Sequence, residues 1–161
     1  MLIGVVSDTH GYIPSAQAAV RMLESLEVEA VLHCGDIGTM DIPPLFKRWP
    51  THFVFGNCDY DRAEVTRAIA ASGLHCHDRF ADLTLADRRI AVLHSDDAQK
   101  FQAAIQSGAY DLVCYGHTHQ AMQQRVGKTI VLNPGALYRA NPLSIALVDL
   151  ETMQITIIPV G

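Results

Sequence analysis

The chain has 161 residues, 49% hydrophobic and 18% charged, a balance typical of a folded globular protein rather than a disordered one. Its net charge of −5, without any basic run, argues against extended nucleic acid as a partner. The apolar runs are far shorter than the about 20 residues that cross a bilayer. Met1 leads straight into a strand-like segment without a basic leader, so we expect neither a membrane protein nor a secreted one.

The first half of the chain alternates short apolar runs, which predict buried strands, with stretches of helical periodicity. The predicted strands span 2–6, 30–34 and 51–55. A helix is predicted from Pro14 to Leu26, a short helix from Pro43 to Trp49, and a helix over 62–72 that Gly73 stops. This order is typical of strand–helix–strand units.

The second half favours hairpins. Strands are predicted at 83–85 and 90–93 around an Asp87-Arg88 turn, and at 122–126 and 129–132 around a type II′ turn at Gly127-Lys128. A helix over 98–106, a strand over 111–115 and a last hairpin of 143–150 with 154–160 complete the chain. No linker or repeat interrupts it, so we expect one domain, 1–161, of the α/β class with mixed sheets.

The four cysteines, Cys34, Cys58, Cys76 and Cys114, form no CxxC pair, so the spacing of a zinc knuckle or a thioredoxin-type site is absent. Cys34 and Cys114 lie in apolar runs, and we expect both to be buried thiols. Reduced thiols fit the cytoplasm, which is the location we expect.

Metal-capable side chains follow five of the predicted strands. These segments are Asp8-Thr9-His10, Gly35-Asp36, Gly56-Asn57-Cys58-Asp59, His94 and Gly116-His117-Thr118-His119. Each segment alone has a simpler interpretation: a helix cap, a turn, an Asx turn before Arg62, or two histidines on one face of a strand. Their conjunction favours a ligand site, because the carboxyl ends of strands in open α/β sheets border the binding crevice.

The donors in these segments are carboxylate, amide and imidazole groups. The predicted metal ligands are Asp8, His10, Asp36, Asn57, His94, His117 and His119. Such a set suits Mn²⁺, Fe²⁺, Zn²⁺ or Ni²⁺ rather than a thiolate zinc site. Seven ligands exceed the needs of one ion and suit two ions about 3.5–4 Å apart with one bridging carboxylate.

In this order, the DTH, GD, GNCD, H and GHTH segments resemble the calcineurin-like metallophosphoesterases, and within them the small YfcE-like phosphodiesterases. The resemblance extends from Asp8 to the NPG segment at 133–135. It implies a four-layer α/β/β/α sandwich and hydrolysis of small phosphate esters, diesters above all, by a metal-bridging hydroxide.

The resemblance also implies roles for individual residues. Asp8, His10 and His119 would hold one divalent ion, Asn57, His94 and His117 the other, and Asp36 would bridge them. Mn²⁺ is the expected metal, with Ni²⁺, Fe²⁺ and Zn²⁺ as alternatives. The residues named for catalysis are Asp36, Asn57, Asp59 and His117.

The chain departs from the family pattern at three places. Cys58 stands where larger relatives carry a histidine thought to protonate the leaving group, and a thiol is a poor acid for that task. Ser95-Asp96-Asp97 replaces a glycine-containing turn, and Ala136 replaces a serine after NPG. The substitution at Cys58 predicts a preference for leaving groups that depart without protonation.

Several residues keep two interpretations at this point. Asp59 is expected to orient a ligand histidine by a hydrogen bond, and His33 either braces the site or belongs to the core. Tyr12 and Arg139 are candidates for substrate contact or ordinary surface residues. The remaining histidines, which have no ligand partners in the sequence, are expected to be surface or structural residues: His52, His75 and His77.

Two functions of different kinds fit the resemblance. The first is the hydrolase. The second is a protein-binding scaffold like the retromer subunit of similar fold, a role that accompanies loss of a metal-binding histidine. His10, His94, His117 and His119 are all present, which favours the enzyme. Exposed hairpin edges near the C-terminus leave room for a homo-oligomer.

Overall fold

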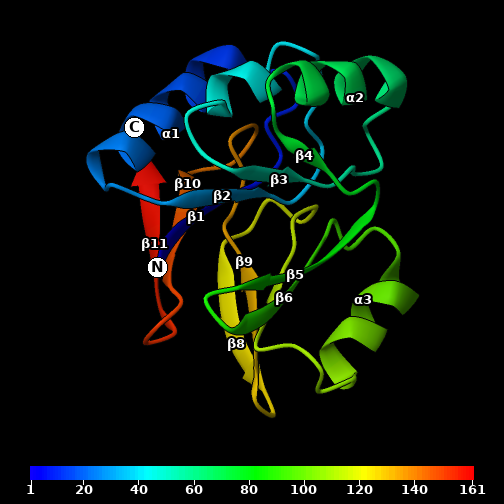
Figure 1. Ribbon diagram of the computed structural model, residues 1–161, viewed down its shortest axis with the longest axis vertical. Coiled ribbons are helices and arrows are strands. Elements are labelled where there is room, and N and C mark those ends of the chain that lie inside the picture. The colour runs from blue at the N-terminus through cyan, green and yellow to red at the C-terminus, as the bar shows by residue number, and fades with distance from the viewer.

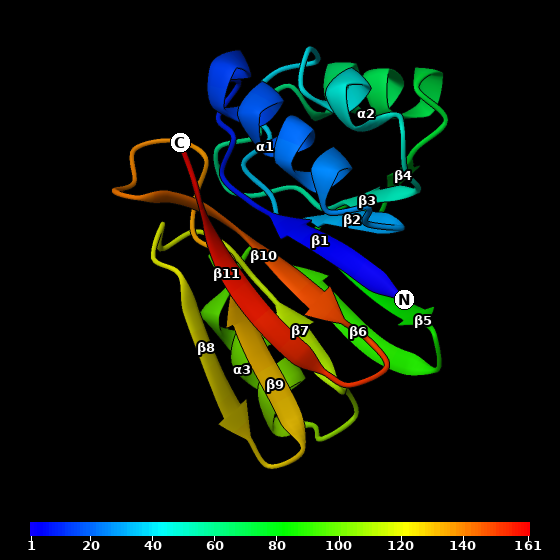
Figure 2. The ribbon, with the colours of Figure 1, turned by 90° about the vertical axis from the view of Figure 1, so that its left-hand side faces the viewer.

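Two β-sheets pack face to face in the middle of the molecule, with helices on both outer faces (Figure 1 and Figure 2). The computed structural model describes residues 1–161. The first sheet and its helices comprise β1 (Leu2–Val6), α1 (Ile13–Ser25), β2 (Ala30–His33), the 3₁₀ helix η1 (Pro43–Phe46), β3 (Thr51–Phe53), α2 (Arg62–Ala71), β4 (His75–Cys76), β10 (Leu143–Asp149) and β11 (Gln154–Val160). The second comprises β5 (Phe80–Leu85), β6 (Arg88–Leu93), α3 (Ala98–Gln106), β7 (Leu112–Cys114), β8 (Met122–Val126) and β9 (Thr129–Asn133).

Both sheets combine parallel central strands with antiparallel strands at an edge. The first sheet has the order β11–β10–β1–β2–β3–β4, in which β1 to β4 are parallel and Val6 lies opposite His33. The second has the order β5–β6–β7–β9–β8, in which β6, β7 and β9 are parallel. The predicted α/β fold with mixed sheets is confirmed, and the carboxyl ends of the parallel strands in each sheet meet at one edge.

Three apolar clusters hold the layers together. One packs α1, α2 and η1 on the first sheet and includes Phe46 and Phe53. A second lies between the sheets, where Leu32 and Leu112 are fully buried, and a third packs α3 on the second sheet around Val113. Central strands buried on both faces explain the continuous apolar runs of the sequence. The layers therefore follow the helix–sheet–sheet–helix order that the resemblance implies.

The helices begin where the sequence predicts, for local reasons. Pro14 occupies the first turn of α1, where its missing N–H costs no hydrogen bond. The cap of α2 is Asp61, whose carboxylate accepts a hydrogen bond from the N–H of Glu64 at 3.3 Å. The Asx-turn interpretation, in which residues 57 and 59 would cap this helix, is therefore wrong. Asp97 caps α3 in the same way, through the N–H of Lys100.

Two local predictions need correction, and one strand was missed. The short helix after Pro43 is a 3₁₀ turn that ends at Phe46. The turn between β5 and β6 consists of Ala86 and Asp87, both at positive φ, while Arg88 already pairs in β6. The two-residue strand β4 has no periodicity of its own and was not predicted; it forms because residues 75–76 add to the free edge of β3.

None of the helices is long and apolar enough to cross a membrane. All four cysteines are free, and Cys34 and Cys114 are fully buried, as expected. Burial raises the pKa of both thiols, so they stay protonated at neutral pH.

The three histidines without an expected ligand role form a stack at β3 and β4. The ring of His52 lies 4.7 Å from that of His75 and 5.1 Å from that of His77, measured between centroids. His52 Nδ1 is 2.8 Å from His77 Nε2, so one of the two nitrogens carries the shared proton. Burial, followed by the charges of His77 and His75, lowers the pKa of His52 to about 4. A structural role is the one that this packing supports.

The stack predicts that the fold loses stability in acid. His52 has a lower pKa in the folded state than the ordinary value of 6.5, so the unfolded chain binds the extra proton first. The free energy of unfolding should therefore fall as pH drops from about 6.5 to about 4, and His52→Gln should flatten that slope. Urea unfolding of metal-free wild type and variant at pH 7 and pH 4.5 measures the difference. Parallel pH profiles in the two proteins would contradict the prediction.

Candidate metal centre

The segments that follow β1, β2, β3, β6 and β7 meet at the carboxyl edge of the two sheets. Backbone hydrogen bonds tie them together: Asp8 N–H donates to Gly35 O at 3.0 Å and His10 N–H to Asp36 O at 2.9 Å. Gly116 N–H donates to His94 O at 3.3 Å. Residues separated by more than 20 positions in the chain therefore lie side by side.

Asp8, His10 and His119 aim donor atoms at one point. His119 Nε2 is 3.1 Å from Asp8 Oδ1 and 3.3 Å from His10 Nε2, and His10 Nε2 is 3.6 Å from the same carboxylate oxygen. The set contains one carboxylate oxygen and two imidazole nitrogens with ligand spacing. These are the three residues predicted to share one ion.

Asp36 lies between this group and His94. Its Oδ2 is 3.5 Å from His10 Nε2 and 3.1 Å from His94 Nε2. Asp8 Oδ1 is 3.8 Å from His94 Nε2, so Asp8, Asp36 and His94 form a second compact group. Asp36 thus lies within reach of both groups, and its bridging role stays a prediction.

The protein anchors one atom of each buried donor and leaves the other turned inward. Asp8 Oδ2 accepts hydrogen bonds from Ser7 Oγ at 2.6 Å and from the N–H of His117 at 3.1 Å. Asp36 Oδ1 accepts from the N–H of Cys58 at 2.8 Å. His94 Nδ1 lies 2.8 Å from Cys34 O and, as the donor of that pair, leaves the lone pair on Nε2.

Two of the inward atoms lack any hydrogen-bond partner although they are buried: Asp8 Oδ1 and His94 Nε2. Burial opposes ionisation of both carboxyls, but the neighbouring His10 and His94 outweigh it. The pKa of Asp8 is lowered, and that of Asp36 is lowered to about 2, so both are carboxylates at neutral pH. Buried anions and unpaired lone pairs are costly unless a cation satisfies them. The donor set therefore fits divalent metal ions.

Asn57 and His117 lie at the outer side of the centre, and both are exposed. The ring of His117 lies 5.2 Å from that of His94 in a T-shaped arrangement. The side-chain amide of Asn57 donates to Cys58 Sγ at 3.5 Å instead of pointing to another predicted ligand. The metal-binding roles of these two residues stay predictions.

Five of the predicted ligands have a left-handed backbone, which only glycine adopts without strain. The residues at positive φ are Asp8 (55°), His10 (46°), Asp36 (52°), His117 (74°) and His119 (58°). Strand β7 ends at Cys114, so His117 and His119 belong to a loop, and the interpretation that they alternate on one face of a strand is wrong. The loop conformation, rather than strand alternation, sets where these side chains lie.

Glycines let the loops approach closely. A Cβ atom at Gly116 would lie 2.0 Å from Ser7 Oγ and 2.7 Å from Asp8 Oδ2, and one at Gly56 would lie 2.1 Å from Asp36 Oδ1. Any larger residue at either position would displace an anchored carboxylate. The glycines that precede Asn57 and His117 in the sequence, Gly56 and Gly116, are thus part of the site.

Asp59 does not orient a ligand histidine, which corrects its expected role. Its two carboxylate oxygens accept hydrogen bonds from the N–H groups of Gly38 at 2.9 Å and Gly56 at 2.8 Å. Burial raises the pKa of this carboxyl. Asp59 therefore joins the loops that follow β2 and β3 and fixes the backbone next to Asp36.

Cys58 is half-buried, and its Sγ falls within ligand spacing of His10 and Asp36. Burial and the charge of Asp36 raise the pKa of the thiol. A protonated thiol with a raised pKa is a weak acid, in keeping with the departure from the family pattern noted in the sequence.

His33 is both a core residue and a brace for the site. It is fully buried and stacks on Phe53 with ring centroids 5.2 Å apart. Its Nε2 lies 3.0 Å from the hydroxyl of Thr9, the residue between Asp8 and His10. A core histidine thus braces the first ligand loop.

Tyr138 was not predicted as a site residue, yet its ring lies 5.4 Å from that of His10 and 5.8 Å from that of Tyr12. Position 138 is separated from position 12 by most of the chain, and no periodicity links them. The only signal is that Tyr138 follows the NPGA segment, which the fold brings to the loop after β1.

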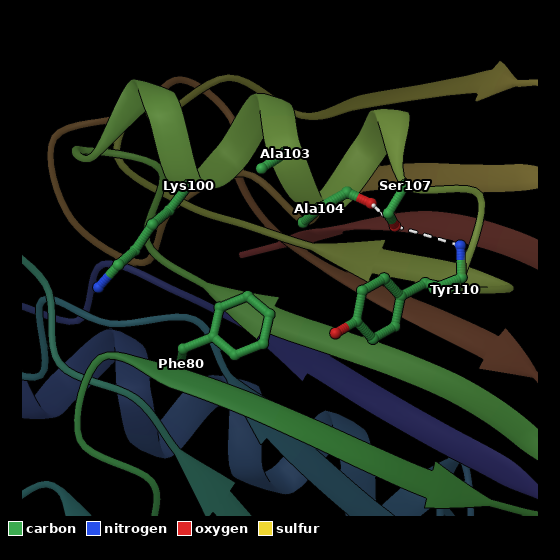
Figure 3. A pocket seen from close by; sticks show the side chains of 7 residues that line it. Phe80, Lys100, Ala103, Ala104, Ser107 and Tyr110 are labelled. Carbon is green, nitrogen blue, oxygen red and sulfur yellow. Dashed lines mark hydrogen bonds between the residues drawn. The ribbon is translucent and has the colours of Figure 1, made fainter.

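One hollow of the surface adjoins the metal centre, and another lies away from it. His119 forms part of the wall of one, of about 320 Å³, together with Asn141 and residues of β10 and β11. A mostly apolar hollow of about 360 Å³ lies beneath α3, where Phe80 and Tyr110 face the helix (Figure 3). The second hollow contains no predicted site residue, so the first is the one that offers room beside the metal centre.

Residues 1–153 match the model of the calcineurin-like phosphoesterase superfamily domain, and the chain belongs to that family. It is 30% identical over 159 residues to phosphodiesterase MJ0936 of Methanocaldococcus jannaschii, with 96% of each chain covered. The resemblance inferred from the motifs is thereby confirmed.

Solved structures of similar proteins have the same fold. A structure described as a novel archaeal phosphodiesterase has a TM-score of 0.92 and 28% identity, with 99% of each chain covered. YfcE, a phosphoesterase from E. coli, has a TM-score of 0.71 with 100% of each chain covered, and at 16% identity it supports the fold alone. The four-layer fold and the family of metal-dependent phosphate-ester hydrolases are therefore those of this chain.

Proposed function

We propose that the protein is a two-metal phosphodiesterase acting on small phosphate esters. The observation that carries the proposal is the pair of buried, partnerless atoms Asp8 Oδ1 and His94 Nε2, which lie 3.8 Å apart, with Asp36 Oδ2 3.1 Å from His94 Nε2. We infer that Asp8, His10 and His119 hold one ion, that Asn57, His94 and His117 hold the other, and that Asp36 bridges them. Two bound divalent ions supply an activated water nucleophile and neutralise the phosphate charge.

The chain's own groups prepare the site for this chemistry. The N–H of Cys58 and the hydroxyl of Ser7 hold the two carboxylates in fixed orientations, so little reorganisation is needed on binding. The carbonyl of Cys34 fixes the tautomer of His94. Asn57 and His117, at the exposed side, are the predicted ligands that a substrate meets first.

The preference for aryl leaving groups rests on proton transfer, and the preference for diesters rests on the phosphodiesterase relative. Cys58 occupies the position of the expected acid, and its raised pKa makes it a weak proton donor. Aryl esters release phenolates whose conjugate acids have a low pKa and do not need such a donor, whereas alkyl esters do. The phosphodiesterase relative MJ0936 supports the same substrate class.

The remaining features of the proposal follow from composition and packing. Oxygen and imidazole donors suit Mn²⁺, Ni²⁺, Fe²⁺ or Zn²⁺, and the family resemblance makes Mn²⁺ the metal that we propose. The net charge of −5 favours small substrates over extended nucleic acid, and four free cysteines fit a cytoplasmic location. We propose that residues 1–161 act as one domain, and that copies pair through the open edges of β8 or β11 if the protein is a homo-oligomer.

The alternative of a protein-binding scaffold has less support. Unpartnered lone pairs in the interior lower the stability of a protein that binds no cation, so they favour a chain that binds metal. All four histidines expected of an active member are present, and His10, His94 and His119 point into the centre.

The proposal predicts both the metal content of the protein and which of two esters is hydrolysed faster. After reconstitution with Mn²⁺, elemental analysis should find two ions per chain, and bis-p-nitrophenyl phosphate should be hydrolysed faster than glycerol phosphate. The chelator-treated protein is the control and should be inactive on both. One ion or none would contradict the two-metal model, and faster hydrolysis of the alkyl monoester would contradict the diester preference.

A further inference from the structure

A column of aromatic rings runs from the metal centre to the surface. The ring of Tyr138 packs on that of His10 with centroids 5.4 Å apart and on that of Tyr12 with centroids 5.8 Å apart. Tyr12, at the outer end, is 48% exposed. The rings are tilted to one another, by 42° between His10 and Tyr138 and by 47° between Tyr12 and Tyr138, and the column leads from a predicted metal ligand to a half-exposed tyrosine.

The backbone on both sides of the column is fixed to the ligand loops. The N–H of Tyr12 donates to Thr9 O at 2.8 Å, and the N–H of Leu137 donates to Ser7 O at 3.1 Å. The hydroxyl of Ser15 also donates to Leu137 O. The two tyrosines thus keep their position relative to Asp8 and His10, as a preformed binding surface requires.

A positive charge accompanies the rings. The guanidinium of Arg139 lies 5.1 Å from the centroid of Tyr138, within the range of a cation–π contact. The carbonyl of Arg139 lies 3.4 Å from Nδ1 of His119, which can donate to it. In a chain of net charge −5, a cation beside the centre favours an anionic ligand.

We propose that Tyr12 and Tyr138 form a stacking platform that binds a flat aromatic substituent of the phosphoester, while its phosphate occupies the metal centre. The ligand class is a phosphoester bearing an aryl ring or a nucleobase. This proposal rests on the proposed function, because it needs the phosphate to sit beside His10. Stacking on tyrosine tolerates either ring, since both present a π-face.

The test is equilibrium binding of phosphonates and phosphates that are matched except for the ring. Calorimetry on the Mn²⁺-loaded protein compares phenylphosphonate with cyclohexylphosphonate, and thymidine 5′-phosphate with deoxyribose 5-phosphate. Wild type should bind the member with the aromatic ring about tenfold more tightly in at least one pair. The first pair reports an aryl substituent and the second a nucleobase.

Variants assign the preference to the platform. Tyr12→Leu and Tyr138→Leu should abolish it, while Tyr12→Phe and Tyr138→Phe should keep it, because the ring and not the hydroxyl is used. The control is Tyr60→Leu, which removes a tyrosine that is 88% exposed on the loop after β3 and should keep the preference. Elemental analysis of every variant verifies that the metal centre is intact.

The outcomes separate this proposal from the function on which it rests. The platform is overturned if wild type shows no preference for the aromatic ligand. It is also overturned if the preference survives in both leucine variants, or if Tyr60→Leu loses it. Hydrolysis of methyl p-nitrophenyl phosphate is measured in the same samples. If the protein does not hydrolyse this diester but still binds aromatic ligands more tightly through the two tyrosines, the proposed diesterase activity is refuted and the platform is supported.

Discussion

Asp36→Asn is expected to empty both metal positions and to slow diester hydrolysis by at least about 10³-fold, since the ions contribute several kcal/mol to transition-state stabilisation. Asp36 Oδ2 lies between His10 and His94, so a neutral amide there weakens both groups of ligands at once. Elemental analysis and initial rates on bis-p-nitrophenyl phosphate measure the two effects.

Two further variants make this expectation specific. Asp41→Asn removes the same charge at an exposed position and should keep wild-type metal content and rate. Asp59→Asn should keep part of the activity, with a loss of about 10–100-fold, because Asp59 holds the loop backbone and not a ligand. Retention of one full metal equivalent in Asp36→Asn would contradict the bridging role.

Cys58→His should raise the turnover of alkyl esters by about 10²-fold and leave the turnover of aryl diesters nearly unchanged. Position 58 faces His10 and Asp36, so an imidazole there reaches the reacting phosphate and supplies the acid that the thiol provides poorly. Aryl leaving groups depart without a proton and gain little. Paired rate measurements on glycerol phosphate and bis-p-nitrophenyl phosphate test the difference.

Cys58→Ser is the matched control, because it changes the thiol without introducing an imidazole, and it should leave the ratio of the two rates at its wild-type value. An equal gain on both substrates in Cys58→His, or no gain on the alkyl ester, would show that proton donation to the leaving group is not limiting. A different acid would then have to be sought.

The strands and helices that bury a regular apolar pattern were predictable from the sequence. The boundaries of α3 and of β11 agree with the prediction, and each terminus has a local cause such as the Asp97 cap. The strand β4 was missed because two residues carry no periodicity, and the pairing of its edge with β3 is decided by tertiary contact alone. The division of the strands between two stacked sheets came from the family resemblance and not from the patterns.

The site was partly predictable for a related reason. Strand ends and glycines identify Asp8, Asp36 and His94 as neighbours, since parallel strands end at one edge. They do not tell what each polar atom contacts. Asp59 binds two backbone N–H groups and His117 lies in a left-handed loop, and neither fact has a signature in residue spacing. Tyr138 joins the centre through a contact between distant segments, which a single sequence does not record.

Five predicted ligands have a left-handed backbone. At these positions the thermal stability of the protein and its activity make opposite demands on the residue. Each such residue costs about 1–3 kcal/mol relative to a relaxed conformation, and glycine would relieve most of that cost. Glycine would also remove the donor, so these positions cannot be optimised for both properties at once. Stabilising substitutions in proteins commonly lose function at such places. An effort to obtain a more heat-resistant form should therefore change the sheets and the outer helices and leave Asp8, His10, Asp36, His117 and His119 as they are.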